Sequence, residues 1–373
     1  MSEKQGPDKT IILHIGLHKT GTSSIQATLK HNQDVLRDRG VLYPGFLPPN
    51  HSQFFINAFS ERAEHYHANR RQGLDAAAIA ERASEQMDRL GRALSRFGGP
   101  TVLLSGEDAC TLQAPEVTQV RSRLDALTGS VGVNTAYRVL LYTRNPAAFV
   151  SSAMQENVKG NGMRLEDSRE LHIRNAAGRY RRIYEAWTTA FGEDAVEFRC
   201  FETACKAPGG LIGDFLGRIG LADDGIEHQL SNEGISDEVT QFLSSLYLPG
   251  SGAGHGRLQD CQTRIDLTPQ DRDTLFALRG SKGDLLSLDD QIRTWDAVAD
   301  DMRFLQSRFG ITYERPEAGR VARNGKFGPD FLHDLALALP RLSAPTCEAL
   351  LHYLLTRPVD PHSSTDTNGA RIT

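Results

Sequence analysis

The sequence predicts an α/β fold: a mainly parallel sheet flanked by helices, with a helical insertion and a largely helical C-terminal part. Two observations predict it. Short apolar runs rich in β-branched residues, typical of buried strands, alternate with longer helical patterns. A glycine-containing loop also joins the first of these runs to a helix, which is how α/β nucleotide folds begin. At 373 residues, the chain could hold two domains or one domain with a large insertion.

Four runs are predicted to be buried strands. The first covers residues 10–16 (TIILHIG) and the second residues 101–105. The third covers residues 137–143 (YRVLLYT), and Pro146 suits the first turn of the helix that follows it. The fourth covers residues 195–201 (AVEFRCF). Strands separated by helices in this way usually lie parallel in one sheet.

Helical patterns separate these runs. After the first strand the apolar residues are spaced as on one face of a helix, and longer helical stretches follow: Ile25, Leu29, Val35 and Leu36, then residues 74–97, 115–127 and 171–191. The expected organisation is a core at residues 10–220 that contains a helical insertion at residues 46–99, where the insertion would form one wall of an acceptor cleft. A helical part at residues 221–359 completes the fold, between disordered tails at residues 1–9 and 360–373.

The most informative stretch is GLHKTGTSS at residues 16–24. A loop between a buried strand and a helix presents backbone N–H groups at the helix N-terminus, where an anion is favoured. Gly21 lets the backbone come close to that anion, Lys19 supplies a charge, and Thr22 and Ser23 supply hydroxyl donors. The usual P-loop, G-x-x-x-x-G-K-[ST], has its lysine after the second glycine, so this is not a standard ATP-binding loop. A mere turn and helix cap would explain the glycine and threonine but not the lysine.

A second candidate anion site lies at residues 137–152. Arg144 follows the third strand, and ligands of open α/β sheets bind outside the carboxyl ends of the strands. Ser152 comes eight residues later, a distance of about two helical turns plus the tight turn after the strand. The Ser152 hydroxyl and the Arg144 guanidinium could therefore share one phosphate. The alternative is an arginine in a surface ion pair, with Pro146 merely starting a helix.

The first motif resembles the 5′-phosphosulfate loop of PAPS-dependent sulfotransferases, P-K-[ST]-G-T-[TS]. This P-loop-related family includes bacterial and carbohydrate-acting members. The resemblance implies a P-loop NTPase-like three-layer sandwich that uses PAPS (3′-phosphoadenosine-5′-phosphosulfate) as co-substrate and releases PAP. It implies that the donor is bound by His18, Lys19, Thr20, Gly21, Thr22 and Ser23. His18 stands where the family usually has proline.

The second motif, R-N-P with a serine eight residues after the arginine, resembles the 3′-phosphate-binding element of the same family. It implies that Arg144 and Ser152 hold the 3′-phosphate, with Ser151 as a substitute if the helix register differs. Both motifs occur in family order, about 125 residues apart. The resemblance extends over residues 10–220 without the insertion. A late stretch, residues 323–330 with Arg323 to Lys326, resembles a loop that closes over the 3′-phosphate in Golgi-type relatives, or is an ordinary exposed turn.

The resemblance implies in-line transfer of a sulfuryl group to an acceptor hydroxyl or amine, with Lys19 stabilising charge on the leaving oxygen. The acceptor also needs a base, which in the family is a glutamate or a histidine. Glu107, after the second strand, is the favoured candidate, His51 in the insertion is the next, and Asp108 is the third. Glu107 could instead be a helix N-terminal carboxylate, and His51 a loop residue. No metal is required, and no metal-ligand spacing occurs in the sequence.

Composition limits the remaining classes of function. A net charge of −5 argues against a general nucleic-acid binder. Five scattered cysteines, a polar N-terminus and no long apolar run predict a soluble cytoplasmic protein without a transmembrane segment. The expected acceptor is a small molecule or glycan, with a carbohydrate or glycolipid favoured. The alternatives are a P-loop kinase that uses Mg²⁺, and a nucleotide-binding module without catalysis.

Overall fold

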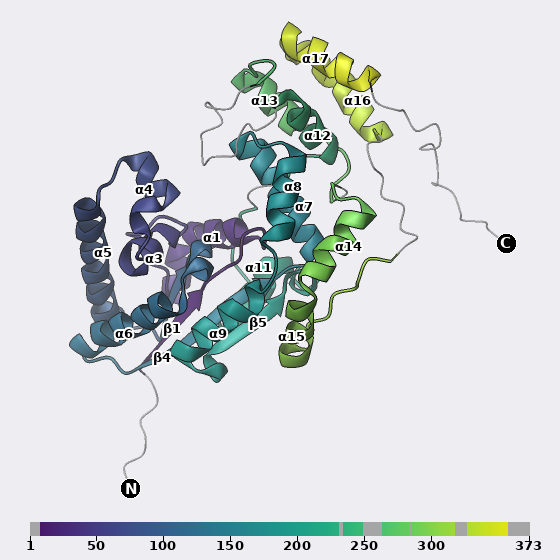
Figure 1. Ribbon diagram of the computed structural model, residues 1–373. Coiled ribbons are helices and arrows are strands. Elements are labelled where there is room, and N and C mark those ends of the chain that lie inside the picture. The colour runs from purple at the N-terminus through teal and green to yellow at the C-terminus, as the bar shows by residue number, and fades with distance from the viewer. Residues whose placement is uncertain (1–7, 231–233, 249–262, 284, 318–326, 357–373) are drawn as a thin grey trace, which may run out of the picture. The chain divides into compact units, whose positions relative to one another are not determined.

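The computed structural model describes residues 8–230, 234–248, 263–283, 285–317 and 327–356. They include a five-stranded parallel sheet with the strand order β2-β3-β1-β4-β5. Figure 1 labels three of its strands, β1, β4 and β5. Its strands are β1 (Lys9–His14), β2 (Val41–Leu42), β3 (Thr101–Ser105), β4 (Thr135–Thr143) and β5 (Val196–Cys200). The predicted α/β fold is confirmed, and each of the predicted strands is present. The sequence did not indicate β2, because two residues are too few to show a strand period.

The chain forms two compact units. The first consists of Met1–Asn145, Gly178–Asn232 and Asp300–Tyr313 and contains the whole sheet. The second consists of Pro146–Ala177, Glu233–Ala299 and Glu314–Thr373. The domain boundaries expected from the sequence stay predictions. Of the expected tails, residues 1–7 and 360–373 lie outside the described residues, whereas Lys9 is the first residue of β1.

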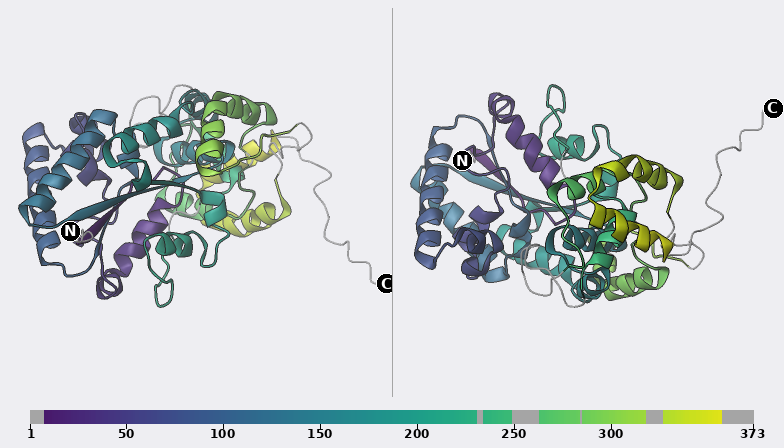
Figure 2. Two further views of the ribbon diagram at one scale, coloured as in Figure 1. Left: turned by 90° about the horizontal axis from the view of Figure 1, so that it is seen from below. Right: turned by 90° about the horizontal axis from the view of Figure 1, so that it is seen from above.

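Helices cover both faces of the sheet in the first unit (Figure 2). On one face α1 (Thr22–His31) packs against α11 (Gly210–Arg218). On the other face α6 (Ala114–Ser130) packs against α9 (Arg179–Phe191), which also contacts β4 and β5. The sheet is therefore the middle of three layers.

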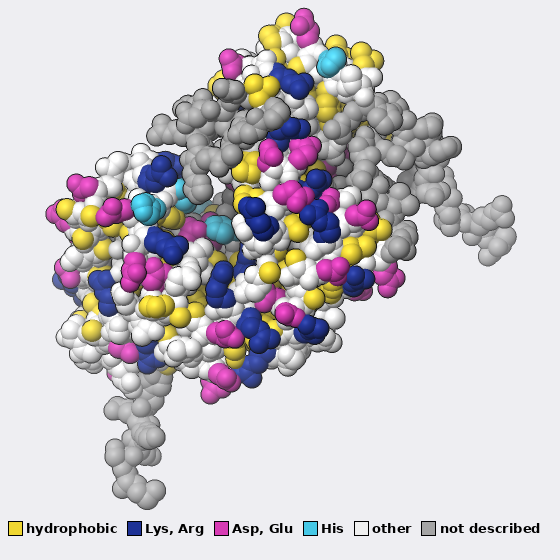
Figure 3. All heavy atoms as spheres, in the orientation of Figure 1, with side chains coloured by type: hydrophobic (Ala, Val, Ile, Leu, Met, Phe, Trp, Pro, Cys, Tyr) yellow, Lys and Arg dark blue, Asp and Glu magenta, His cyan; other side chains and the backbone are white. Residues whose placement is uncertain are grey.

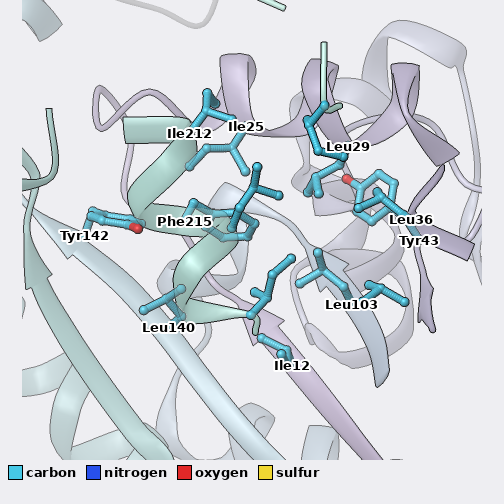
Figure 4. Close-up of a cluster of buried hydrophobic side chains, with 14 of the residues drawn as sticks. Ile12, Ile25, Leu29, Leu36, Tyr43, Leu103, Leu140, Tyr142, Ile212 and Phe215 are labelled. Atoms are coloured by element: carbon cyan, nitrogen blue, oxygen red, sulfur yellow. The ribbon is translucent and has the colours of Figure 1, made fainter. Parts of the chain in front are cut away.

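The face under α1 and α11 holds a buried apolar cluster (Figure 4). It combines side chains from the two helices with side chains from the three central strands: Ile25, Leu29, Ile212, Phe215, Ile12, Leu103, Leu140 and Tyr142. Burying an aliphatic or aromatic side chain of this size stabilises a fold by about 1.5–3 kcal/mol. The cluster anchors β1 and α1 from the same side, and so fixes both ends of the loop between them.

The insertion at residues 46–99 is helical, as predicted. It contains α3 (Ser52–Phe59), the short η1 (Ala63–His65), α4 (His67–Gln72) and α5 (Ala76–Arg96). The long α5 begins after Asp75, whose carboxylate accepts a hydrogen bond from the Ala78 N–H at 2.8 Å. All of these helices belong to the sheet-containing unit.

Two helices expected to be continuous are interrupted. The stretch at residues 171–191 divides into α8 (Leu165–Arg174) and α9, because Gly178 adopts a left-handed φ of 65° directly before α9. The apolar pattern after β1 divides into α1 and α2 (Gln33–Asp38) at Asn32, whose side-chain amide donates to the Thr28 carbonyl at 2.8 Å. In both places the apolar period continues across the break, so the pattern alone predicted one helix.

The described part of the second unit is helical. Its helices are α7 (Pro146–Asn161), α8, α12 (Asp237–Leu246), α13 (Pro269–Phe276), α14 (Leu288–Ala297), α16 (Pro329–Ala338) and α17 (Ala344–Leu355). All of these helices except α14 contribute to a buried cluster that includes Val158, Phe242, Leu275, Phe331 and Leu350. The largely helical C-terminal part is thus confirmed within the described residues.

The surface carries charges of both signs. On the face shown in Figure 3, Lys and Arg side chains are interspersed with Asp and Glu rather than gathered in one area. No helix formed by the described residues is both long enough and apolar enough to cross a membrane. The described cysteines, Cys110, Cys200, Cys205 and Cys347, are free thiols.

We expect Asp301→Ala to destabilise the sheet-containing unit. Asp301, in α15 (Ala299–Phe309), is 1% exposed and accepts hydrogen bonds from the backbone N–H groups of Tyr180 and Arg181, both at 3.1 Å. The alanine variant would leave these two donors at the start of α9 unpaired, which costs about 2–4 kcal/mol. Urea unfolding of the full chain measures the loss.

The neighbouring Asp300→Ala is the matched control. Asp300 is 82% exposed and pairs only with Arg303 in the same helix, so its removal should change the free energy of unfolding by no more than about 0.5 kcal/mol. Equal losses in the two variants would contradict the assigned role of Asp301.

Candidate functional site

The loop between β1 and α1 has an unusual backbone. Gly16, Lys19 and Gly21 all have positive φ, at 53°, 66° and 73°. Among the described residues Lys19 is the one non-glycine residue in this region of φ, which costs an L-residue about 1–2 kcal/mol. A Cβ atom on Gly16 would lie 2.8 Å from the Cα of Glu107, so only glycine fits there. Such strain is typical of functional loops.

The loop closes into a tight turn before α1. The Thr20 backbone N–H and hydroxyl both donate to the Leu17 carbonyl, at 3.3 and 2.6 Å. Gly21 then precedes the first residue of α1, Thr22, and provides no side-chain cap; no acidic residue lies in the first turn. The N-terminus of α1 therefore lies at the carboxyl end of β1, where an anion would meet its positive dipole.

Arg144 meets this loop. It follows β4, which is the neighbour of β1 in the sheet, and its Nη1 donates a hydrogen bond to the Lys19 carbonyl oxygen. The two motifs predicted from residues 125 positions apart are thus in direct contact. Tyr180 fixes the Arg144 backbone, since its hydroxyl donates to the Arg144 carbonyl and accepts from the Arg144 N–H, both at 3.0 Å.

The Arg144 guanidinium is partly buried and incompletely paired. It lies over the Phe201 ring at 5.2 Å, and its buried Nε has no hydrogen-bond partner among the described residues. Burial lowers the pKa of Arg144, and the nearby Glu202 carboxylate opposes this shift. A buried, unpaired guanidinium donor is costly unless it meets an acceptor, so the position suits the phosphate of a ligand.

Ser152 and its neighbour Ser151 lie in α7 of the second unit. Ser151 is buried and Ser152 is partly exposed. The pairing of Arg144 with Ser152 stays a prediction. Arg323 and Lys326 of the late loop lie outside the described residues.

Glu107 lies beside the loop. It opens the short helix η2 (Glu107–Thr111) after β3, and its Oε2 accepts a hydrogen bond from the Thr22 hydroxyl at 2.5 Å. Its Oε1 accepts from the Asn50 amide at 3.3 Å. These hydrogen bonds position the carboxylate. The Glu107 side chain is still 20% exposed, so solvent or a ligand can reach it. Its role as a base stays a prediction.

A second carboxylate, Asp108, joins His18 to the insertion. Its Oδ1 lies 2.9 Å from His18 Nε2, its Oδ2 accepts from the Tyr66 hydroxyl at 2.7 Å, and its backbone N–H donates to the Ser52 hydroxyl at 2.9 Å. His18 Nδ1 lies 3.7 Å from Glu107 Oε2. The sequence did not indicate this network, because its members come from three separate segments; the charged pair Glu107–Asp108 beside a glycine was its only signal.

The network shifts the pKa values of its members. Burial disfavours the imidazolium of His18, but the hydrogen bond to Asp108 and the charges of Asp108 and Glu107 outweigh burial, so the pKa of His18 is raised. Burial likewise raises the pKa of Asp108, but the hydrogen bonds from His18 and Tyr66 outweigh it, so this pKa is lowered. Near neutral pH the pair therefore favours imidazolium and carboxylate.

His51 is a packing residue in this structure. Its side chain is fully buried, its Nδ1 accepts from the Ser105 N–H at 3.0 Å, and its ring stacks on Tyr43 with centroids 4.5 Å apart. Burial lowers the pKa of His51 to about 3, and Lys30 adds to this effect. The imidazole is thus enclosed and neutral near pH 7 in this structure, and the alternative of His51 as base stays a prediction.

In the described parts of the chain, no cluster of three or more His, Cys, Asp or Glu side chains has the arrangement of a metal site.

Comparison of the sequence with models of known protein families, and with curated proteins, found no match to either. Solved structures do match. One, the crystal structure of a sulfotransferase from Alicyclobacillus acidocaldarius, is 18% identical, with 61% of this chain and 86% of that chain covered and a TM-score of 0.36. Another, the sulfotransferase domain from the curacin biosynthetic pathway, is 12% identical, with 73% and 97% covered and a TM-score of 0.35. At such identities and TM-scores, neither similarity assigns an activity to this chain.

Proposed function

We propose that this protein transfers the sulfuryl group of PAPS to an acceptor hydroxyl, with a carbohydrate or glycolipid favoured as acceptor. The observation that carries the proposal is the hydrogen bond from Arg144 to the Lys19 carbonyl. It joins two anion-binding motifs at the carboxyl ends of neighbouring parallel strands. A donor with a 5′-phosphosulfate and a separate 3′-phosphate needs two such sites side by side.

Each residue of the proposed donor site has a distinct task. The backbone N–H groups at the start of α1, including that of Thr22, and the hydroxyl of Ser23 bind the 5′-phosphosulfate, while the Thr22 hydroxyl donates to Glu107. Arg144 and Ser152 bind the 3′-phosphate. Lys19 stabilises the negative charge that develops on the bridging oxygen as PAP leaves.

Glu107 is the proposed base. During the transfer the acceptor oxygen forms a bond to sulfur, the bond from sulfur to the bridging oxygen breaks, and the acceptor proton passes to the Glu107 carboxylate. The hydrogen bonds from Thr22 and Asn50 orient this carboxylate toward the loop. Catalysis then consists of positioning and charge stabilisation, with no covalent intermediate on the protein.

The direct test incubates the protein with PAPS and extracts of small molecules and glycans. An acceptor should gain the mass of one SO₃ group only when both protein and PAPS are present. Replacement of PAPS by ATP tests the kinase alternative, for which the mass of a phosphoryl group would be gained instead. Absence of any transfer together with tight PAP binding would favour the nucleotide-binding module.

We expect PAP to bind without added metal, and Arg144→Ala to weaken this binding by about 10- to 100-fold, because a charge-assisted hydrogen bond of about 1.5–3 kcal/mol is lost. Calorimetry measures both affinities. AMP, which lacks the 3′-phosphate, should bind wild type and Arg144→Ala alike.

Arg138→Ala is the matched control. Arg138 lies on β4, the strand that Arg144 follows, and its exposed guanidinium pairs with Glu197, so PAP affinity should not change. If PAP binds wild-type protein no better than AMP does, the 3′-phosphate role of Arg144 is wrong.

A further inference from the structure

The proposed donor site has an electrostatic difficulty. Two adjacent carboxylates, Glu107 and Asp108, lie against a loop that has to bind a multiply charged anion. Glu107 Oε2 contacts Thr22 in the loop itself. A carboxylate at this distance repels a phosphosulfate, and partial burial strengthens the repulsion because less water screens it. Some cation has to offset these charges if the donor is to bind well.

His18 is placed to supply that cation. It belongs to the phosphate loop, and its ring lies between the two carboxylates: Nε2 is 2.9 Å from Asp108 Oδ1 and Nδ1 is 3.7 Å from Glu107 Oε2. A protonated imidazole has an N–H on both nitrogens and can face both carboxylates at once, whereas a neutral one has a single N–H. Its side chain is 46% exposed, so it can exchange protons with water.

The insertion holds this arrangement from the other side. Tyr66 donates to the second oxygen of Asp108, and Ser52 receives a hydrogen bond from the Asp108 backbone. The Ser52 bond fixes the backbone of Asp108, and its carboxylate cannot turn away from His18 without breaking the bond from Tyr66. The other charged and titratable groups that act on His18 are Lys19 in the loop, Glu107 in η2 and His67 in α4. Lys19 opposes protonation of His18, and Glu107 and Asp108 favour it.

We propose that His18, held by Asp108, is a positioning residue whose imidazolium offsets the carboxylates at the phosphate loop, so that the nucleotide binds tightly only while His18 is protonated. This inference rests on the proposed function, because it takes PAP and PAPS as the anions of the loop. It adds a dependence of donor binding on pH, which is specific to a chain with histidine at this position.

The sign of the dependence follows from the pair. The pKa of His18 is raised above 6.5 and that of Asp108 is lowered below 3.8. The ion pair is therefore complete between these limits and is lost as the pH rises through the pKa of His18. Above that pH the two carboxylates lose the imidazolium between them, and nucleotide binding weakens.

The experiment measures PAP affinity by calorimetry at pH 6.5 and pH 9 for wild type, His18→Gln and His31→Gln. Glutamine keeps a hydrogen-bond donor for Asp108 but carries no charge at either pH. His31 is the matched control, because it is also 46% exposed and its Nε2 also lies 2.9 Å from a carboxylate, Glu227, away from the loop. The variants are compared with wild type at the same pH, so the protonation state of the PAP phosphates is the same in each comparison and cannot cause a difference in affinity.

At pH 6.5 we expect wild type to bind PAP about five- to tenfold more tightly than His18→Gln, because one partly screened charge is lost in the variant. At pH 9 the affinities of the two proteins should agree within about twofold. His31→Gln should match wild type at both values. The imidazole NMR signal of His18, assigned by its absence from His18→Gln, should titrate with a midpoint above 6.5 and at lower pH in Asp108→Asn.

Three results would overturn the inference, and they are distinguishable. If PAP binds wild type but the ratio to His18→Gln is the same at both pH values, the charge of His18 is not used and the proposed function stands. If wild type binds no PAP at either pH, the proposed function is wrong, and the inference that rests on it is wrong as well. The NMR midpoint needs no ligand; a midpoint unchanged in Asp108→Asn would refute the pairing itself.

Discussion

Lys19→Ala is expected to lower the rate of sulfuryl transfer at saturating PAPS by about 10²- to 10³-fold, the usual cost of losing one charge-stabilising donor in a transition state. Lys19 meets charge that develops only as the bridging oxygen leaves, so its loss should reduce kcat more than donor affinity. The positive φ at this position costs alanine about as much free energy as lysine, so the backbone of the loop should not change. Product formation from PAPS, followed by mass spectrometry, measures the rate.

Lys30→Ala serves as the control for charge. Lys30 lies in the last turn of α1, where its ammonium donates to the Gly45 carbonyl at 3.2 Å in an exposed position. Its removal lowers the net charge by the same amount and should leave kcat within about twofold. A Lys19 variant as active as the Lys30 variant at saturating PAPS would disprove the assigned role.

Glu107→Gln is expected to reduce kcat by about 10²- to 10⁴-fold without weakening PAP binding, because a base acts on the acceptor rather than on the donor. Glutamine has nearly the same size as glutamate, and its amide oxygen can accept the hydrogen bond from Thr22, so the protein should fold. It cannot take the acceptor proton. Turnover at saturating PAPS and calorimetry with PAP separate these two effects.

Two variants distinguish Glu107 from the other candidates for the base. Asp108→Asn removes the neighbouring carboxylate, and we expect most of kcat to remain at saturating PAPS. His51→Ala empties a buried site that Ser105 and Tyr43 enclose, so it should lower the melting temperature more than the turnover per folded molecule. An active Glu107→Gln beside an inactive His51→Ala would move the base into the insertion.

The fold could be predicted from the sequence where a local signal matched a buried element. The runs at β1, β3, β4 and β5 are apolar, short and bounded by turns, and in the structure each of them forms a strand. Local signals failed where tertiary structure overrode them. The left-handed Gly178 separates two helices although the apolar period continues across it, and β2 is a strand only because Val41 and Leu42 lie beside Thr101 and Val102.

The candidate site shows the same division. The loop around Lys19 and the arginine at residue 144 could be predicted because each follows a strand, and parallel strands bring their carboxyl ends to one edge. That His51 is enclosed and His18 is paired could not be predicted, since both depend on side chains from distant segments. A histidine in a polar sequence context is equally compatible with either environment.

Synthesis of the chain from its N-terminus has a consequence for when this site can form. The segment from β1 to α1 emerges first, but the arginine that meets Lys19 is made 125 residues later. The sheet-containing unit also draws on Asp300–Tyr313, because Asp301 fixes the helix start that carries Tyr180, and Tyr180 in turn fixes Arg144. A nascent chain that has not yet reached Asp301 would contain the whole phosphate loop and still lack the support that aligns it. Nucleotide binding should therefore be a late event in folding, after more than three quarters of the 373 residues have been synthesised.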